Sequence, residues 1–300
     1  MIKYFSKAFK ITNENIILAT PLVLFLFILS LYIEFTKRAP ENVAAAILLL
    51  VTVLFMIGAF FAGWLFMTKQ AVKISNQVFE DEEEKAKASF NLLKDFNYGI
   101  GEFFLPFVGA AILYGTILVV IVIAAYKAGM HFIGDPGIDF VQIKRALTST
   151  AEMKALITSL STQQLAKINA WNFMLIGVTF VQSFLTMFWG CEIIYRTKNP
   201  IIALFKSIQS IFKKPLGAII LFLYISFVNF IVSFINAILA FNSILYFLSM
   251  LLYFYFIVYI IVLIFFYYER EILKQEENNS NSRTDSIGQK PPGDSDSKEE

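Results

Sequence analysis

Few residues in this sequence combine the types and the spacing that catalysis or coupled transport requires. Glu192 and Arg196 stand four positions apart at the end of an apolar run, so on a helix their side chains would meet. One interpretation makes Glu192 a proton-coupling or ion-coupling group, because acids inside a membrane are costly and often functional. Its place about one turn from the end of the run favours a second interpretation, a structural ion pair at the membrane interface.

A metal site is a weak hypothesis. His131 is the single histidine, and Asp135 and Asp139 follow it, but the intervening Pro136-Gly137 would interrupt any helix aligning the three side chains. The sequence has no phosphate-binding Gly-x-x-x-x-Gly-Lys loop, no Gly-x-Ser-x-Gly and no His-Glu-x-x-His. We therefore expect no catalytic residue, no metal and no cofactor, and we do not expect an enzyme.

Polar side chains form stripes on two of the apolar runs. One run carries Thr179, Gln182, Ser183 and Thr186, and another carries Ser226, Asn229, Ser233 and Asn236. At 100° per residue each set lies on one helix face. Either the stripes line a polar path between two spans, or they form interhelical hydrogen bonds at a packing face, which we favour. The spacing of Gly58 with Ala62, and of Ala59 with Gly63, likewise indicates close helix packing.

The composition indicates a membrane protein. Hydrophobic residues make up 57% of the chain and charged residues 16%, whereas soluble domains average nearer half and a quarter. The net charge of +2 is small and the basic residues are scattered, so we expect no nucleic-acid partner. The single cysteine, Cys191, excludes an internal disulfide and lies in an apolar run, as expected of a packing residue.

Six apolar runs are long enough to cross the roughly 30 Å hydrocarbon core at 1.5 Å per residue. We predict an all-α polytopic membrane domain over residues 1–270, built as three helical hairpins. The spans are expected at about 16–35, 43–67, 100–125, 171–195, 216–240 and 244–268. Residues 127–169 should form an extracytoplasmic loop with short surface helices. Residues 271–300 are mostly polar, charged, Pro or Gly, which predicts a disordered cytoplasmic tail.

Amphipathic segments precede the hairpins. In residues 203–215, the apolar residues Leu204, Phe205, Ile208, Ile211 and Phe212 are expected on one face, and Lys206, Ser207, Gln209, Ser210 and Lys213 on a polar face, as in helices that lie at the membrane interface. Residues 7–15 align with 206–214 without a gap, and residues 90–99 fit more loosely. Between them, residues 68–97 should include a solvated helix in which Asp81 pairs with Lys85 and Glu83 pairs with Lys87. Three units, each an interfacial helix and two spans, are therefore predicted.

The chain resembles poorly characterised bacterial six-span membrane proteins, such as the membrane domain attached to some glycerophosphodiester phosphodiesterases. The likeness rests on Lys-Ala-Phe-Lys at residues 7–10 and Asn-Glu-Asn at residues 13–15, and on similar segments before later hairpins. It covers residues 1 to about 270 and includes no catalytic motif. It implies a bacterial inner membrane and assigns no functional residue.

Taken together, the N-terminal segment, the second and fourth loops and the tail carry more basic residues than the first, third and fifth loops, so both termini should be cytoplasmic. The first functional hypothesis is a non-enzymatic accessory, scaffold or lipid-interacting factor that contacts membrane lipid. The alternative is a transporter or permease component with a polar path between spans four and five. A homo-oligomer and a membrane-protein partner both remain open.

Overall fold

The computed structural model describes residues 1–36, 42–77, 79, 81–139, 141, 144, 146 and 149–274. Every regular element in these residues is helical, and six helical stretches are long and apolar enough to cross a membrane. They are Ile16–Thr36, Val43–Ile74, Glu83–Phe132, Thr162–Tyr195, Pro215–Leu239 and Ser243–Leu273. The predicted all-α polytopic fold is confirmed. The predicted tail beyond residue 274 and the first hairpin turn lie outside the described residues.

The first hairpin follows a short amphipathic helix. This helix is α1 (Ile2–Glu14), and a single turn, η1 (Ile16–Leu18), joins it to α2 (Ala19–Thr36). The returning helix is α3 (Val43–Ile74), whose first turn is capped by Asn42, because the Asn42 side chain accepts a hydrogen bond from the backbone of Ala44 at 2.9 Å. α3 extends beyond its predicted end, so the residues just after Met67 are helical.

The second hairpin differs most from the prediction. A single helix of 51 residues, α4 (Glu82–Phe132), replaces the expected solvated helix and separate span. The Asp81 carboxylate caps it by accepting from the Glu84 backbone at 2.6 Å, and Lys85 pairs at 2.7 Å with Glu14 of α1, so the predicted Asp81–Lys85 pair is wrong. Polar and apolar residues share one helix because the backbone bonds of a helix do not depend on the surrounding solvent.

The second half of this hairpin is divided among several helices. It contains α6 (Thr150–Ser159), α7 (Thr162–Thr186) and α8 (Trp189–Tyr195). A capping box begins α7, since Gln164 and Ser161 bond reciprocally there. Span four was expected to be continuous from residue 171, whereas it begins at Thr162 and breaks at Met187 and Phe188.

The third hairpin begins with α9 (Pro200–Lys213), followed after a break at Lys214 by α10 (Pro215–Leu239). Asn242 caps the last long helix, α11 (Ser243–Tyr267), which continues into the π-helical segment η2 (Tyr268–Leu273). The break between the two helices lies immediately before Pro215. A proline there removes no helical hydrogen bond, because the first turn of a helix has no internal acceptor for its N–H groups.

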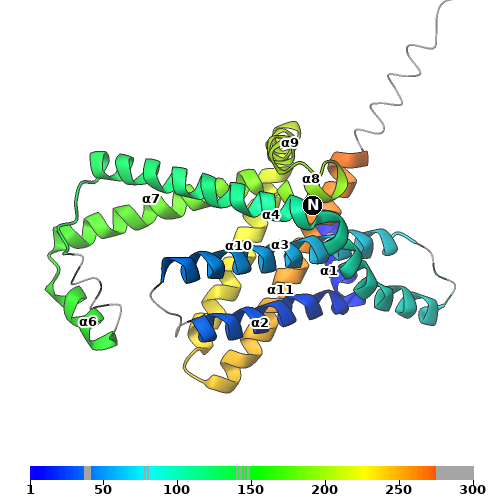
Figure 1. Cartoon of the computed structure of the whole chain (residues 1–300), viewed down its shortest axis with the longest axis horizontal. Helices are drawn as coiled ribbons and strands as arrows, with labels where there is room; N and C mark the ends of the chain where they lie inside the picture. The colour runs from blue at the N-terminus through cyan, green and yellow to red at the C-terminus, as the bar shows by residue number, and fades with distance from the viewer. Residues whose placement is uncertain are drawn as a thin grey trace, which may run out of the picture.

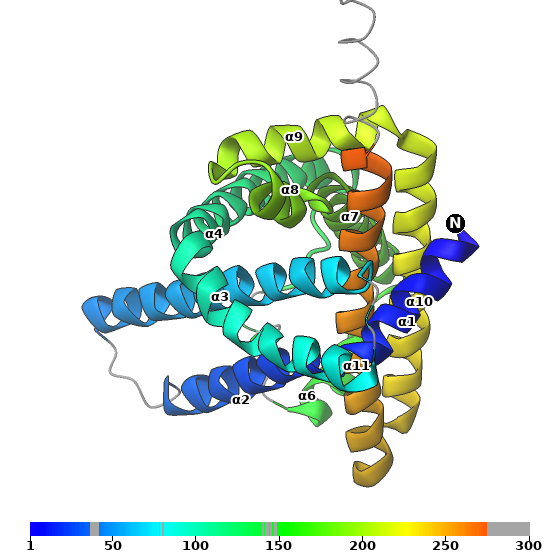
Figure 2. The same cartoon turned by 90° about the vertical axis from the view of Figure 1, so that its right-hand side faces the viewer.

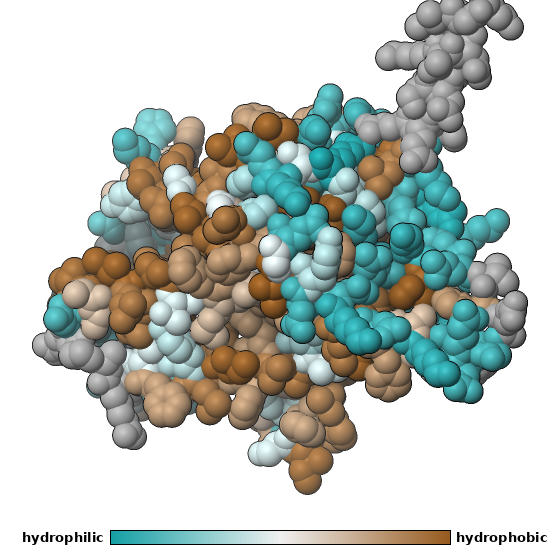
Figure 3. All heavy atoms as spheres, turned by 45° about the vertical axis from the view of Figure 1, so that its right-hand side comes forward, coloured by the Kyte–Doolittle hydropathy of each residue, from teal (hydrophilic) through white to brown (hydrophobic). Residues whose placement is uncertain are grey.

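The three hairpins diverge from a common end of the fold, which we call the base (Figure 1). It contains the ends of α3, α8 and η2 together with α9, which lies across one end of the upright α10 and α11 in Figure 2. Many of the largest fully buried side chains belong to it, including Met67, Phe188, Ile211, Phe265 and Tyr268. In the view of Figure 3, polar side chains gather near this end and apolar side chains cover the hairpins.

The amphipathic lead-in of each unit packs on a neighbouring unit. Phe9 of α1 contacts Tyr255 and Tyr259 of α11 edge to face, at 6.1 and 6.2 Å between ring centroids. The first part of α4 crosses α3, and α9 packs on α8. The first unit thus packs on the third through α1, the second on the first through α4, and the third on the second through α9. The three units therefore contact one another in a closed cycle.

The gapless alignment of residues 7–15 with residues 206–214 pairs buried positions of α1 with buried positions of α9. Ala8, Ile11 and Thr12 are buried in α1, and the aligned residues Ser207, Ser210 and Ile211 are buried in α9. The aligned end residues have similar backbone angles, φ −126° and ψ 48° at Asn15 against φ −136° and ψ 65° at Lys214. The two aligned segments therefore agree in their buried positions and in their end geometry as well as in sequence spacing.

Candidate functional site

The Glu192 carboxylate lies at the centre of the base and is fully buried. It accepts a hydrogen bond from Ser210 Oγ of α9 at 2.7 Å, and it forms an ion pair with Arg196 at 3.3 Å. The Arg196 guanidinium also lies over the ring of Tyr268, 5.6 Å from its centroid. The structure therefore contains the Glu192–Arg196 pair, but the acid is enclosed by protein and does not lie at an exposed interface.

A second carboxylate joins three helices. Glu269 of η2 accepts hydrogen bonds from Tyr195 Oη of α8 at 3.0 Å and from the Asn76 side chain, just after α3, at 3.3 Å. These bonds connect the C-terminal ends of the three hairpins. Because both oxygens of Glu269 are occupied, it acts structurally as a three-way junction.

A third carboxylate, Glu271, accepts hydrogen bonds from Tyr4 of α1 and from the Lys214 ammonium. Burial, together with the acceptance of its hydrogen bond by Glu271, raises the pKa of Tyr4 to about 12. The phenol therefore stays protonated at neutral pH and remains a donor. The contact fixes α1 to the break between α9 and α10.

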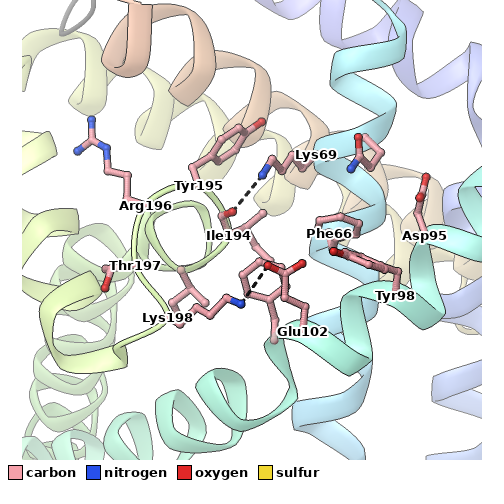
Figure 4. Close-up of a pocket in the computed structure, with 13 residues that line it drawn as sticks. Phe66, Lys69, Asp95, Tyr98, Glu102, Ile194, Tyr195, Arg196, Thr197 and Lys198 are labelled. Carbon is pink, nitrogen blue, oxygen red and sulfur yellow. Dashed lines mark hydrogen bonds and ion pairs between the residues drawn. The ribbon is translucent and has the colours of Figure 1, made fainter.

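A cavity of about 600 Å³ opens beside these networks, between α3, α4 and residues 193–198. Lys69 of α3 lies in it half-buried, donates to the Ile194 carbonyl at 3.2 Å and lies over the Tyr195 ring at 4.9 Å. On the opposite wall, Lys198 forms an ion pair with Glu102 at 3.0 Å. Figure 4 shows Lys69 directed toward the Ile194 carbonyl, Lys198 directed toward Glu102, and Arg196 directed away from both.

The two predicted polar stripes do not meet. Thr179 and Thr186 donate to carbonyls of their own helix at 3.0 Å, and Gln182 is buried with no partner for its Nε2 among the described residues. On α10 the stripe residues Asn229 and Ser233 are exposed, Ser226 and Asn236 are half-buried, and on α7 Ser183 is exposed. Aromatic side chains join α7 to α10 instead, since Phe180 and Phe184 contact Phe222 at 4.6 and 5.2 Å between ring centroids.

The residues of the weak metal hypothesis stabilise local structure. Asp135 and Asp139 each accept a hydrogen bond from the backbone two residues later, at 2.8 and 3.1 Å, as in Asx turns. His131 is exposed beside Phe132. In the described part of the chain, no three His, Cys, Asp or Glu side chains come close enough to hold a metal ion.

Sequence reasoning overlooked the cavity. It placed Lys69 in a polar segment after the second span, whereas the structure places it inside α3, within the candidate span. A lysine within a span was the available signal, because such residues are costly and often mark ligand sites. No spacing in the sequence relates Glu102 or Lys198 to Lys69.

No family model, no curated protein and no solved structure matches this chain. The likeness to the membrane domain of some glycerophosphodiester phosphodiesterases therefore stays a prediction.

Proposed function

We propose that this chain is a non-enzymatic lipid-interacting factor of the bacterial inner membrane, with both termini in the cytoplasm and its base in the cytoplasmic headgroup layer. Its interfacial helices bind anionic phospholipid, and the hairpins hold these helices in place. The observation that carries the proposal is the arrangement of side chains around α9.

Helix α9 has three distinct faces. Its buried face consists of Ala203, Ser207, Ser210 and Ile211, which are small or beta-branched and pack on the protein. The sequence placed Ser207 and Ser210 on the outward polar face, and this was wrong, because Ser207 donates to the Leu185 carbonyl and Ser210 to Glu192. The large side chains point away from the protein, with Phe205 68% and Phe212 71% exposed.

An outward apolar face favours a lipid environment over water. Burying a phenylalanine side chain contributes about 1.5–3 kcal/mol, so two exposed rings on one helix are unfavourable in water and favourable among acyl chains. Lys206 and Lys213 lie on the flank of this face by helical position. Each lysine near an anionic membrane surface contributes about 1 kcal/mol of attraction.

Helix α1 repeats this pattern. Ile2 is 83% exposed and Phe9 50% exposed, and Lys3 and Lys10 are exposed on a different part of the same helix. The base therefore offers two amphipathic helices with basic flanks. The transporter alternative has less support, because the side chains that join α7 to α10 are aromatic.

Fluorophores attached to single cysteines would test the proposal. In a Cys191→Ser background, Phe205→Cys, Phe212→Cys and Gln209→Cys each carry an environment-sensitive label in liposomes of phosphatidylglycerol and phosphatidylcholine. Labels at 205 and 212 should be quenched by brominated acyl chains, and the label at 209 should remain accessible to aqueous iodide. Equal access of iodide to all three positions would rule out the interfacial placement of α9.

The lipid preference has its own control. Replacing phosphatidylglycerol by phosphatidylcholine throughout the liposomes should weaken quenching at 205 and 212, since the attraction between the lysine flank and anionic headgroups is then removed. The matched label at Phe173→Cys of α7, which is 76% exposed on a span, should be quenched to the same extent in both mixtures. Equal quenching of the label at position 205 in both lipid mixtures would contradict a preference for anionic lipid.

A further inference from the structure

The Lys69 ammonium in the base cavity has unused hydrogen-bonding capacity. A lysine has three donors, and Lys69 donates one hydrogen bond, to the Ile194 carbonyl at 3.2 Å. No carboxylate in the described part of the chain lies within ion-pair distance of it. The nearby acid Glu269 is occupied by Tyr195 and Asn76. A half-buried cation that forms no direct ion pair is suited to binding a further anion.

Across the cavity, Glu102 contacts the second lysine. Its side chain is 28% exposed, and that of its partner Lys198 is 58% exposed. Exposed pairs of this kind are weak, so Lys198 can exchange its partner readily. In Figure 4 the Glu102 carboxylate lies between the ammonium groups of Lys198 and Lys69. An entering anion would take the place next to Lys198 that this carboxylate now holds.

The walls of the cavity suit an interfacial ligand. Phe66 and Phe103 line it, and Tyr98 at its edge is 62% exposed. Aromatic residues of this kind concentrate where headgroups meet acyl chains. Its volume of about 600 Å³ is within the usual range for small-ligand sites, and basic pockets between spans are known sites for lipid headgroups.

We propose that this cavity binds one phosphate-bearing anion, with Lys69 and Lys198 as its cationic contacts and Glu102 as the group it displaces. The inference rests on the proposed function, because it gives the lipid-interacting base a specific headgroup site. The shared chemistry is a phosphate ester, supplied either by a phospholipid headgroup or by a soluble phosphate compound. Asp95 is the other acid of the cavity, and in Figure 4 Phe66 and Tyr98 lie between it and Lys69. Its negative charge disfavours anions that carry several charges.

Titration of the purified full chain in neutral detergent tests the site, with native mass spectrometry as the readout. The probes are dihexanoyl phosphatidylglycerol, glycerol 3-phosphate and dihexanoyl glycerol, which lacks the phosphate. Saturation at one phosphate-bearing molecule per chain is expected, with no saturable binding of dihexanoyl glycerol. Tighter binding of the lipid than of glycerol 3-phosphate identifies a headgroup site, and equal affinities identify a soluble phosphate ester. Failure of both phosphate probes to bind overturns the proposal.

Variants connect the binding to the named residues. Lys69→Gln should weaken binding about tenfold or more, the loss expected for a charged hydrogen bond. Lys198→Gln should also weaken binding, and because its side chain is exposed this variant should fold even if Lys69→Gln does not. Glu102→Gln should tighten binding by removing the competing carboxylate. The control is Lys87→Gln, which removes a cation from an exposed pair with Glu83 outside the cavity and should leave the affinity unchanged.

The outcomes separate this site from the proposed function. Unchanged affinity in both Lys69→Gln and Lys198→Gln overturns the cavity site while leaving the quenching at Phe205 and Phe212 intact. Loss of that quenching with normal titration of glycerol 3-phosphate overturns the interfacial role of α9, and the cavity then binds a soluble anion.

Discussion

Ser210 of α9 donates a hydrogen bond to the buried Glu192 carboxylate of α8 at 2.7 Å. One short polar contact thus holds an amphipathic helix against the end of a membrane-spanning hairpin. It also determines which face of α9 points outward, because Ser210 can reach Glu192 only if Phe205 and Phe212 point away.

Removing this contact should destabilise the base. Ser210→Ala leaves a buried carboxylate with one donor fewer, and hydrogen bonds to charged groups contribute about 1.5–3 kcal/mol. Ser207→Ala on the same face removes only a bond to a neutral carbonyl, and should cost about 1 kcal/mol. Thermal unfolding in detergent compares the two. Equal losses would mean that the charge of Glu192 does not matter to the packing of α9.

The role of Glu192 can be decided by a double-mutant cycle. Glu192→Gln removes the carboxylate charge that pairs with the Arg196 guanidinium, which is 14% exposed, and breaking a buried pair costs about 3–5 kcal/mol. Adding Arg196→Gln should recover part of that loss, so the two losses should not add. Stability of the two single variants and the double variant measures the coupling. Full stability of Glu192→Gln would instead support the coupling-group interpretation.

The crossing of α3 and α4 depends on glycine. A Cβ atom on Gly99 would lie 2.7 Å from the Ala62 carbonyl oxygen, and backbone cannot move aside as a flexible side chain can. Gly99→Ala should therefore destabilise the protein by about 1–3 kcal/mol. Gly101→Ala, two residues later, meets nothing within 4 Å and should stabilise the helix by about 0.5–1 kcal/mol. Unfolding temperatures that shift in the same direction would show that the crossing is not tightly packed.

The proposed topology gives opposite labelling at the two ends. In a Cys191→Ser background, Ser6→Cys on α1 should react with a membrane-impermeant maleimide only in inverted vesicles. Ser159→Cys at the end of α6 should react in right-side-out vesicles, because the 127–169 loop is expected outside. Both serines are exposed. The reverse pattern would place the base on the outer side and exclude cytoplasmic lipid as its ligand.

Much of the fold could be predicted from local signals. The six apolar runs, the break at Pro215 and the capping box at Ser161 each depend on neighbouring residues, so they are visible in the sequence. The spacing of Gly58 with Ala62, and of Ala59 with Gly63, also predicted close packing, and the structure places Gly58 against Val108 and Gly63 against Phe96. These predictions succeed because helix formation and membrane length are decided within a few turns.

The candidate site could not be predicted in the same way. Lys69, Glu102 and Lys198 come from three separate parts of the chain, and no spacing rule relates them. The polar stripe on α10 shows the opposite error, since a regular pattern suggested a shared face but Asn229 and Ser233 are exposed. A stripe defines a direction on one helix, and only the neighbouring helix decides whether that direction is buried.

The sequence by itself determined that this chain forms helices long enough to span a membrane, and that amphipathic segments precede its hairpins. The tertiary structure alone decided which face of α9 is buried, that Glu192 is enclosed, and that a cavity forms around Lys69. The physical reason is that hydropathy and helical period act along the chain, whereas burial, ion pairing and cavity shape arise where distant segments meet.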